Sequence, residues 1–193
     1  MRENTGSADR TVRPCEQRDL DAMREICTET SSLPLRDWRD RQFLLLMYCD
    51  PYVAYTNDCF VAVDVDDRPV GYILCASDTR RFCRDFRENV LPRIGMLGRR
   101  YAAMARGAIA VQKMSAVFAP AHLHIDLTAD ARRKGIGTAL MNTLKTHLAE
   151  HGIGRVMLTC GSSNKPAIAF YKKNGFRVIF KGFGECVMRA GTR

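Results

Sequence analysis

The sequence of 193 residues predicts one mixed α/β domain with a central sheet and flanking helices. Three observations support this prediction. From residue 122 onward the apolar spacing changes in the order strand, helix, strand, helix, strand, strand. Residues 59–76 predict a β-hairpin around a turn at residues 66–69. Residues 78–120 contain helical segments only, which indicates a helical insertion before the fourth strand.

The N-terminal part is expected to hold a short strand and two helices, at residues 11–13, 20–29 and 37–47. Leu20, Met23 and Ile26 share one helical face, and Asp19 is a suitable N-cap. Pro34 separates the two helices. The hairpin that follows consists of strands at residues 59–65 and 70–76, because Asp66, Asp67 and Pro69 are typical of turns.

The insertion at residues 78–120 predicts helices at 80–90 and 99–113, with breaks at Pro92, Gly95 and Gly98. We expect it to cover or shape a site. A peripheral helical layer without any ligand role is equally compatible with the sequence.

The C-terminal part predicts a regular succession of elements: a strand at 122–127, a helix at 134–151, a strand at 155–160, a helix from 164 or 165 to 173, and strands at 176–181 and 185–189. Gly152 is placed to end the first helix in a left-handed C-cap. Pro166 falls in the first turn of the second helix, where its missing N–H group costs little. The exposed strand at 185–189 is expected at a sheet edge, where it would allow a homodimer as well as a monomer.

The segment Arg132-Arg133-Lys134-Gly135-Ile136-Gly137 joins the strand at 122–127 to the following helix. Glycine lets the backbone approach a ligand closely, and a helix N-terminus offers free N–H groups with a partial positive charge. The segment therefore predicts a pyrophosphate site. It is neither a dinucleotide fingerprint, since Leu140 occupies the third glycine position, nor a P-loop.

His122, His124 and Asp126 alternate along the predicted strand and so share one of its faces. Histidine suits proton transfer near neutral pH, which makes this row a candidate source of a general base. Buried histidines are also common as structural residues, so both interpretations stay open for His122 and His124.

Two motifs together resemble the GNAT family of N-acetyltransferases. The first is Arg132-x-x-Gly135-x-Gly137, and the second is Asn164-x-x-Ala167-x-x-Phe170-Tyr171-x-x-x-Gly175-Phe176. The resemblance covers about residues 120–181. It implies a central mixed, mostly antiparallel sheet of six to seven strands, and acetyl-CoA as the acetyl donor.

The resemblance also implies roles for individual residues. Arg132 and the backbone N–H groups of Arg133, Lys134, Gly135, Ile136, Gly137 and Thr138 would bind the pyrophosphate of acetyl-CoA. The strand backbone near Asp126 and Leu127 would hold the pantetheine arm, as would Asn164. The N–H group of Leu127 would polarise the acetyl carbonyl. Tyr171 would donate a proton to the leaving thiolate.

Within the family, two likenesses stand out. Residues 121–124 resemble the Ala-His-Leu-His strand of serotonin N-acetyltransferase. Residues 122–126 together with the Lys-Gly-Ile-Gly turn resemble the acetyltransferase-like C-terminal domain of O-GlcNAcase and its free-standing bacterial relatives, which suits Asp126 and the insertion better. Two functions follow: direct acetyl transfer to a primary amine in a ternary complex, or an acetyl-CoA-binding sensor or scaffold with little catalysis.

Composition and charge indicate the kind of ligand, the state of the cysteines and the location of the protein. The formal net charge is +9, but the basic residues follow no nucleic-acid-binding pattern, so an anionic ligand such as coenzyme A explains the charge without nucleic acid. The eight cysteines form no CxxC pair or zinc-ligand spacing, so we expect reduced thiols and no metal. We expect residues 1–10 to be a loose leader without a secretory signal, and residues 11–193 to form one domain. A cytoplasmic location and no membrane segment follow as expectations.

Overall fold

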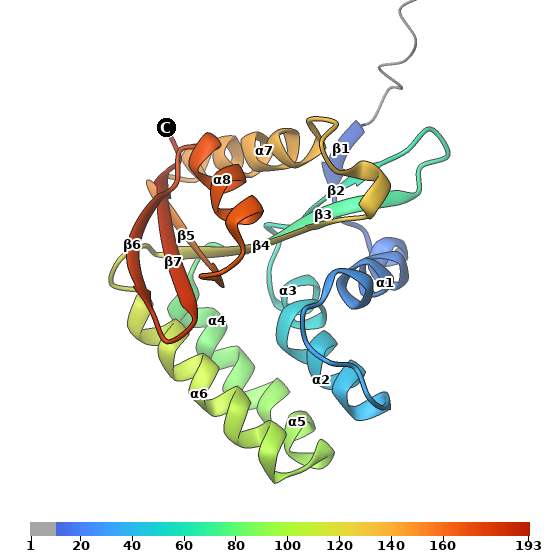
Figure 1. Ribbon diagram of the computed structural model, residues 1–193, viewed down its shortest axis with the longest axis vertical. Coiled ribbons are helices and arrows are strands. Elements are labelled where there is room, and N and C mark those ends of the chain that lie inside the picture. The colour runs from blue at the N-terminus through green and yellow to red at the C-terminus, as the bar shows by residue number, and fades with distance from the viewer. Residues whose placement is uncertain (1–10) are drawn as a thin grey trace, which may run out of the picture.

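The computed structural model describes residues 11–193 (Figure 1), so the leader predicted at residues 1–10 lies outside the described residues. Seven strands form one sheet in the order β1-β2-β3-β4-β5-β7-β6. Their bounds are β1 Thr11–Pro14, β2 Phe60–Val63, β3 Pro69–Ala76, β4 Ala121–Leu127, β5 Arg155–Gly161, β6 Arg177–Gly182 and β7 Glu185–Gly191. Among the described strands, β4 and β5 alone pair in parallel. The predicted mixed, mostly antiparallel sheet is confirmed.

The sheet separates two hydrophobic cores, as the alternation along β3 shows. Tyr72 and Leu74 belong to the first core and Ile73 and Cys75 to the second, because successive side chains of a strand point to opposite faces. The first core lies under the helices α1 Leu20–Thr30, α2 Trp38–Tyr48, α3 Asp50–Tyr55, α4 Thr79–Asp85, α5 Leu91–Leu97 and α6 Arg99–Ser115. The second core lies under α7 Ile136–Glu150 and is flanked by α8 Lys165–Lys173, on the other side of the sheet (Figure 1).

Helix α2 follows the prediction, but α3 was not expected. Asp37 caps α2 by accepting hydrogen bonds from the backbone N–H groups of Arg39 and Asp40. Helix α3 is only six residues long and has Pro51 in its first turn. It is too short to show a helical period in the sequence, and its stability comes from packing of the buried Tyr52.

In the insertion, the predicted breaks at Pro92 and Gly95 are wrong. Helix α4, a π-helical turn at Phe86–Val90 and α5 follow one another without interruption from Thr79 to Leu97. Pro92 lies in the first turn of α5, directly after the π-helical turn, where its missing N–H group is tolerated. Gly98 does end the segment, with a backbone φ of 134°.

The insertion is joined to the rest of the first core by the buried Asp40. Its carboxylate accepts hydrogen bonds from the Tyr101 hydroxyl at 2.7 Å and from the Arg100 guanidinium at 2.8 Å, and it pairs with Arg36 at 3.0 Å. The Tyr101 hydroxyl and Arg36 hold the pKa of this carboxyl well below its usual range. The insertion is therefore packed into the domain core rather than lying loosely on its surface.

The position of β7 in the sheet differs from the sequence expectation. The prediction that residues 185–189 form a sheet edge is wrong, because β7 lies between β5 and β6, which leaves β6 at the edge.

All eight cysteines are free, and six of them are buried. Across residues 11–193, no helix has the length and apolar character needed to cross a membrane.

Candidate functional site

The site lies where β4 and β5 separate. Strand β4 pairs with β3 along nearly its whole length, from His122 opposite Ala76 to Leu127 opposite Gly71. It pairs with β5 only at Ala121 and His122. Beyond His122 the two parallel strands diverge, and in Figure 1 β4 and β5 run in clearly different directions. A gap therefore opens in the middle of the sheet.

The β4 backbone presents free polar groups to this gap. Thr128, just after β4, donates its N–H group to the carbonyl oxygen of Val70 in β3 at 3.0 Å. Because hydrogen-bonded residues alternate along an antiparallel ladder, Asp126 and His124 also bond toward β3. The backbone groups of Ile125 and Leu127 consequently point away from β3, toward the diverging β5. Leu127 N–H is thus placed to donate a hydrogen bond inside the gap.

The turn between β4 and α7 forms a nest of backbone donors. Arg133 and Gly135 both have left-handed backbone angles, with φ of 60° and 82°. Among the described residues, no acceptor is found for the backbone N–H groups of residues 133–138, and the first bond of the helix is donated by Ala139 to Gly135. Consecutive free N–H groups at a helix N-terminus make an anion-binding concavity.

Basic side chains surround this nest. Arg133 and Lys134 are exposed, while Arg132 donates from Nε to the carbonyl oxygen of Leu127 at 3.2 Å. That bond ties the start of the turn to the end of β4. The residues singled out by the sequence at 132–138 thus lie together at one end of the gap.

Gly137 allows close packing and does not have an unusual backbone angle. A Cβ atom at this position would lie 3.0 Å from Cζ of Phe170 and 3.3 Å from Cδ1 of Leu127. The end of β4, the start of α7 and helix α8 therefore converge on Gly137. This contact brings α8, which follows β5, against the turn.

Helix α8 carries the two other residues that the family motif singled out. Asn164 caps the helix, because its side-chain oxygen accepts from the N–H group of Ala167 at 3.1 Å, which leaves its amide NH₂ group available. Tyr171 is half-buried and packs edge-on against Phe170, with ring centroids 5.4 Å apart. Burial, with a smaller effect from Asp126, raises the pKa of the Tyr171 phenol. Its hydroxyl therefore stays protonated at neutral pH.

His122 is the most enclosed member of the row on β4. Its Nε2 lies 2.8 Å from the Tyr52 hydroxyl, and its Nδ1 lies 2.8 Å from the Thr79 hydroxyl. Burial and, to a smaller extent, the neighbouring His124 lower the pKa of His122 to about 3. With both nitrogens engaged and the ring held neutral, His122 has the features of a structural residue.

His124 is half-buried and differs from His122 in its partners. Its ring contacts Tyr48 and Tyr52 edge-on, with centroid distances of 5.3 and 5.2 Å, but it makes no hydrogen bond with a described residue. Burial lowers its pKa to about 4. The imidazole is thus neutral at pH 7 and has nitrogen atoms available to a water or a substrate.

Asp126 lies nearest the end of the gap and is also half-buried. Its Oδ2 accepts a hydrogen bond from the buried Tyr72 hydroxyl at 2.8 Å. Burial raises the pKa of Asp126 to about 6, while the Tyr72 bond opposes this shift. A carboxyl that titrates at about 6 is ionised at pH 7 and is close to the range that suits a general base.

Sequence reasoning did not find the partners of this row. Tyr52, Tyr72 and Thr79 each hydrogen-bond a residue that is 43 to 70 positions away in the chain. No local pattern marks them, since each contact is created when a helix or strand packs against β4.

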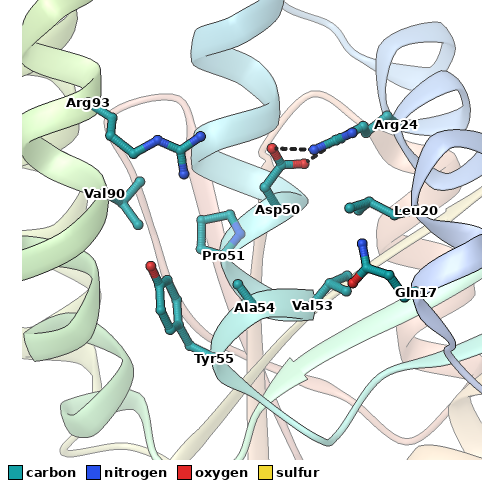
Figure 2. A pocket seen from close by; sticks show the side chains of 10 residues that line it. All are labelled: Gln17, Leu20, Arg24, Asp50, Pro51, Val53, Ala54, Tyr55, Val90 and Arg93. Carbon is teal, nitrogen blue, oxygen red and sulfur yellow. Dashed lines mark hydrogen bonds and ion pairs between the residues drawn. The ribbon is translucent and has the colours of Figure 1, made fainter.

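A separate cleft lies away from this gap. Figure 2 shows this cleft of about 190 Å³ between α1, α3 and the start of α5, lined by Arg24, Asp50, Tyr55 and Arg93 among others. None of the residues predicted for the site lines it. The gap between β4 and β5 is an open separation of strands instead. Within residues 11–193, no three His, Cys, Asp or Glu side chains converge as metal ligands.

Comparison with known proteins adds independent findings. Residues 20–176 match the model of the acetyltransferase (GNAT) family. A stretch of 53 residues is 40% identical to the mycothiol acetyltransferase of Corynebacterium jeikeium strain K411, but it covers only 28% of this chain and 15% of that protein. The chain thus matches a small part of this curated relative.

Two solved structures resemble the whole fold. The crystal structure of SsHAT has a TM-score of 0.85 and 30% identity, covering 95% of this chain and 98% of that one. The PaiA N-acetyltransferase of Thermoplasma acidophilum, crystallised with coenzyme A, has a TM-score of 0.60 and 15% identity, with 95% and 99% coverage. The second likeness concerns the fold alone.

Proposed function

The chain belongs to the acetyltransferase (GNAT) family, and from that premise we propose that it transfers acetyl from acetyl-CoA directly to a primary amine in a ternary complex. The observation that carries the proposal is the gap between β4 and β5. One end of it holds the nest of N–H groups at residues 133–138, and the ionisable Asp126 lies along its β4 side. These features suit a ligand with a pyrophosphate at one end and a reacting group at the other.

Acetyl-CoA fits the groups present along the gap. The nest and the exposed Arg133 and Lys134 would hold the pyrophosphate, whose charge they complement. The free backbone groups of β4 and the amide of Asn164 would hydrogen-bond the pantetheine arm. The N–H group of Leu127 would polarise the acetyl carbonyl, where negative charge develops during attack.

In the proposed reaction the amine nitrogen attacks the acetyl carbonyl carbon. A C–N bond forms, the C–S bond breaks, and one proton must leave the nitrogen while another reaches the sulfur. Asp126 would accept the first proton, directly or through a water held by His124. Tyr171 would supply the second, since its raised pKa keeps the hydroxyl protonated. His122 would serve as a support for the strand.

A second candidate function is an acetyl-CoA-binding sensor or scaffold with little catalysis. One observation favours it: of the three titratable residues on β4, His122 is fully engaged and His124 has a pKa of about 4. Proton acceptance at neutral pH then depends on Asp126 alone. The binding function is the part shared by both candidates.

The experiment measures acetyl-CoA binding by calorimetry and acceptor-dependent release of the CoA thiol over a panel of primary amines. The enzyme is expected to bind acetyl-CoA and to release thiol with at least one amine. Tyr171→Phe should lower turnover by on the order of tenfold to a hundredfold while the Kd for acetyl-CoA stays within about twofold. Ile168→Val, at a position of α8 that packs against the second core, tests for a general effect of altering the helix.

The outcomes separate the two functions. Tight binding without thiol release for any amine would favour the sensor or scaffold. Equal turnover of Tyr171→Phe and the parent protein over a full pH profile would remove Tyr171 from the mechanism. A primary-amine acceptor, a cytoplasmic location, a monomeric or homodimeric state and the covering role of residues 78–120 stay predictions.

A further inference from the structure

The positive charge of the protein is concentrated in the insertion. Residues 79–115, which form α4, the π-helical turn, α5 and α6, hold nine basic and two acidic residues. Their net charge is +7, against +9 for the whole chain. The rest of the molecule is therefore nearly balanced, and the charge attracts anions to one set of helices.

An open groove of about 470 Å³ runs between α6 and the segment that joins the π-helical turn to α5. Its apolar lining comes from Leu91, Ile109 and Met114, with Ala110 between them. Three cations, Arg87, Arg106 and Lys113, also line it and are exposed. The groove thus has an apolar floor and a cationic rim.

The three rim cations have no acidic partner. Arg87 donates from Nε to the carbonyl of Cys83 at 3.2 Å, but neither it nor Arg106 nor Lys113 forms an ion pair with a residue in 11–193. Other cations of the insertion do, since Arg81 pairs with Asp85 and Arg100 with Asp40. All three cations that line the groove are thus uncompensated by an acidic side chain of the described residues.

Apolar side chains are also left uncovered here. Met114 is 73% exposed at the groove, and Val111 is 62% exposed one turn earlier on α6. Exposed apolar surface next to a groove is characteristic of binding sites, and methionine adapts its shape to a partner. The combination calls for a ligand that is both anionic and apolar.

We propose that this groove binds an acidic, amphipathic peptide segment of another protein, with an apolar anchor side chain on the floor and carboxylates at Arg87, Arg106 and Lys113. The volume is in the range of sites that enclose a ligand group. A nucleic acid would leave the apolar floor unfilled. A membrane would contact a protruding apolar surface rather than fill a recess. The proposal is independent of acetyl transfer.

The probe is a fluorescein-labelled peptide of about 14 residues, with leucines at i, i+3 and i+7 and glutamates at the other positions. Fluorescence anisotropy at about 150 mM salt is expected to show saturable binding. A peptide with glutamine in place of the leucines should bind at least tenfold more weakly. Equal binding of the two peptides would mean that the groove floor is not used, and would overturn the proposal.

Matched variants locate the site. Arg106→Glu with Lys113→Glu should weaken peptide binding at least tenfold, whereas Arg155→Glu with Lys181→Glu makes the same charge change at exposed strand positions and should have a much smaller effect. Ala110→Trp should block the groove, whereas Ala108→Trp, exposed on the same helix but outside the lining, should not. Equal losses within either pair would overturn the proposal.

Acetyl-CoA affinity measured by calorimetry should be unchanged in all four variants, which checks that they are folded. Acetyl-CoA binds at the gap between β4 and β5, whereas the peptide assay measures the groove on α6. The peptide result can therefore be interpreted even if the proposed acetyl transfer fails. Binding to phosphatidylserine vesicles or duplex DNA in preference to the peptide would overturn the proposal and assign the charged surface to those partners instead.

Discussion

Asp126 combines two opposed features at the scale of a single residue. Its carboxyl is shielded from water, which raises its pKa to about 6, and it accepts a hydrogen bond from Tyr72, which stabilises the charged form. The protein therefore keeps a carboxylate on the face of β4 at an energetic cost. A group retained at such a cost in an open gap is a candidate for function.

The sign of this cost leads to a first prediction. The folded-state pKa of Asp126, about 6, lies above the ordinary value of 3.8. The contribution of Asp126 to stability is therefore fully present below about pH 4 and is lost as the pH rises through 6. At pH 7, Asp126→Asn should raise the free energy of unfolding by on the order of 1–2 kcal/mol, since it removes the buried charge and keeps an acceptor for Tyr72.

The same variant should lower acetyl transfer by at least tenfold if Asp126 accepts the proton. Urea denaturation at pH 7 and at pH 4 tests the stability effect, which should disappear at the lower pH. A variant that is less stable than the parent at pH 7 would contradict the energetic cost of the Asp126 charge. Unchanged turnover would contradict its role as the proton acceptor.

At the scale of elements, helix α7 has a left-handed glycine at each end. Gly135 has a φ of 82° and Gly152 a φ of 74°, and a Cβ atom would meet nothing within 4 Å at either position. The two sites therefore carry the same backbone constraint in the same open space. They differ in one respect, since only Gly135 belongs to the nest of backbone donors.

This pair provides a second prediction with its own control. Gly135→Ala and Gly152→Ala should each lower the free energy of unfolding by about 1 kcal/mol, because an L-residue is strained at positive φ. Calorimetry should show weaker acetyl-CoA binding, by on the order of tenfold, for Gly135→Ala alone. Equal affinities for the two variants would place the pyrophosphate away from the turn.

At the scale of the whole molecule, His122 on β4 connects three elements. His122 connects β4 to α3 through Tyr52 and to α4 through Thr79, so it links the sheet to the start of the insertion. Burial disfavours the charged ring, and no carboxylate among its partners offsets that cost, so the ring is held neutral. Protonation of His122 is therefore coupled to unfolding of the domain.

A third prediction follows for acid stability. The folded-state pKa of His122, about 3, lies below the ordinary 6.5, so its contribution is present above pH 6.5 and is lost as the pH falls toward 3. His122→Gln should reduce the slope of the unfolding free energy against pH between 4 and 6.5 by up to about 1.4 kcal/mol per pH unit, equal to one proton.

Urea titrations at several pH values measure this slope. His151→Gln, at an exposed position at the end of α7, controls for the loss of a histidine. An unchanged slope in His122→Gln would show that His122 titrates in the folded protein as it does in the unfolded chain, contrary to the pKa lowered by burial.

The sequence predicted most elements because their signals are local. Asp37 and Gly152 mark the ends of helices, the turn at residues 66–69 marks β3, and alternation marks β4. The errors have physical causes as well. Helix α3 is too short to show a period, Pro92 is tolerated after a π-helical turn, and β7 is placed inside the sheet by pairing with both β5 and β6. These three features are set by packing and strand pairing, and not by the local sequence alone.

By itself, the sequence determined the fold class and the place of the nest, because Arg132 to Gly137 acts through local backbone geometry: a left-handed glycine, a helix start and adjacent cations. Only the tertiary structure decided which titratable residue on β4 is engaged and which is available. His122, His124 and Asp126 look equivalent along the strand. They differ in burial and in hydroxyl partners supplied by α3, α4 and β3, and such desolvation and pairing arise only when distant segments pack together.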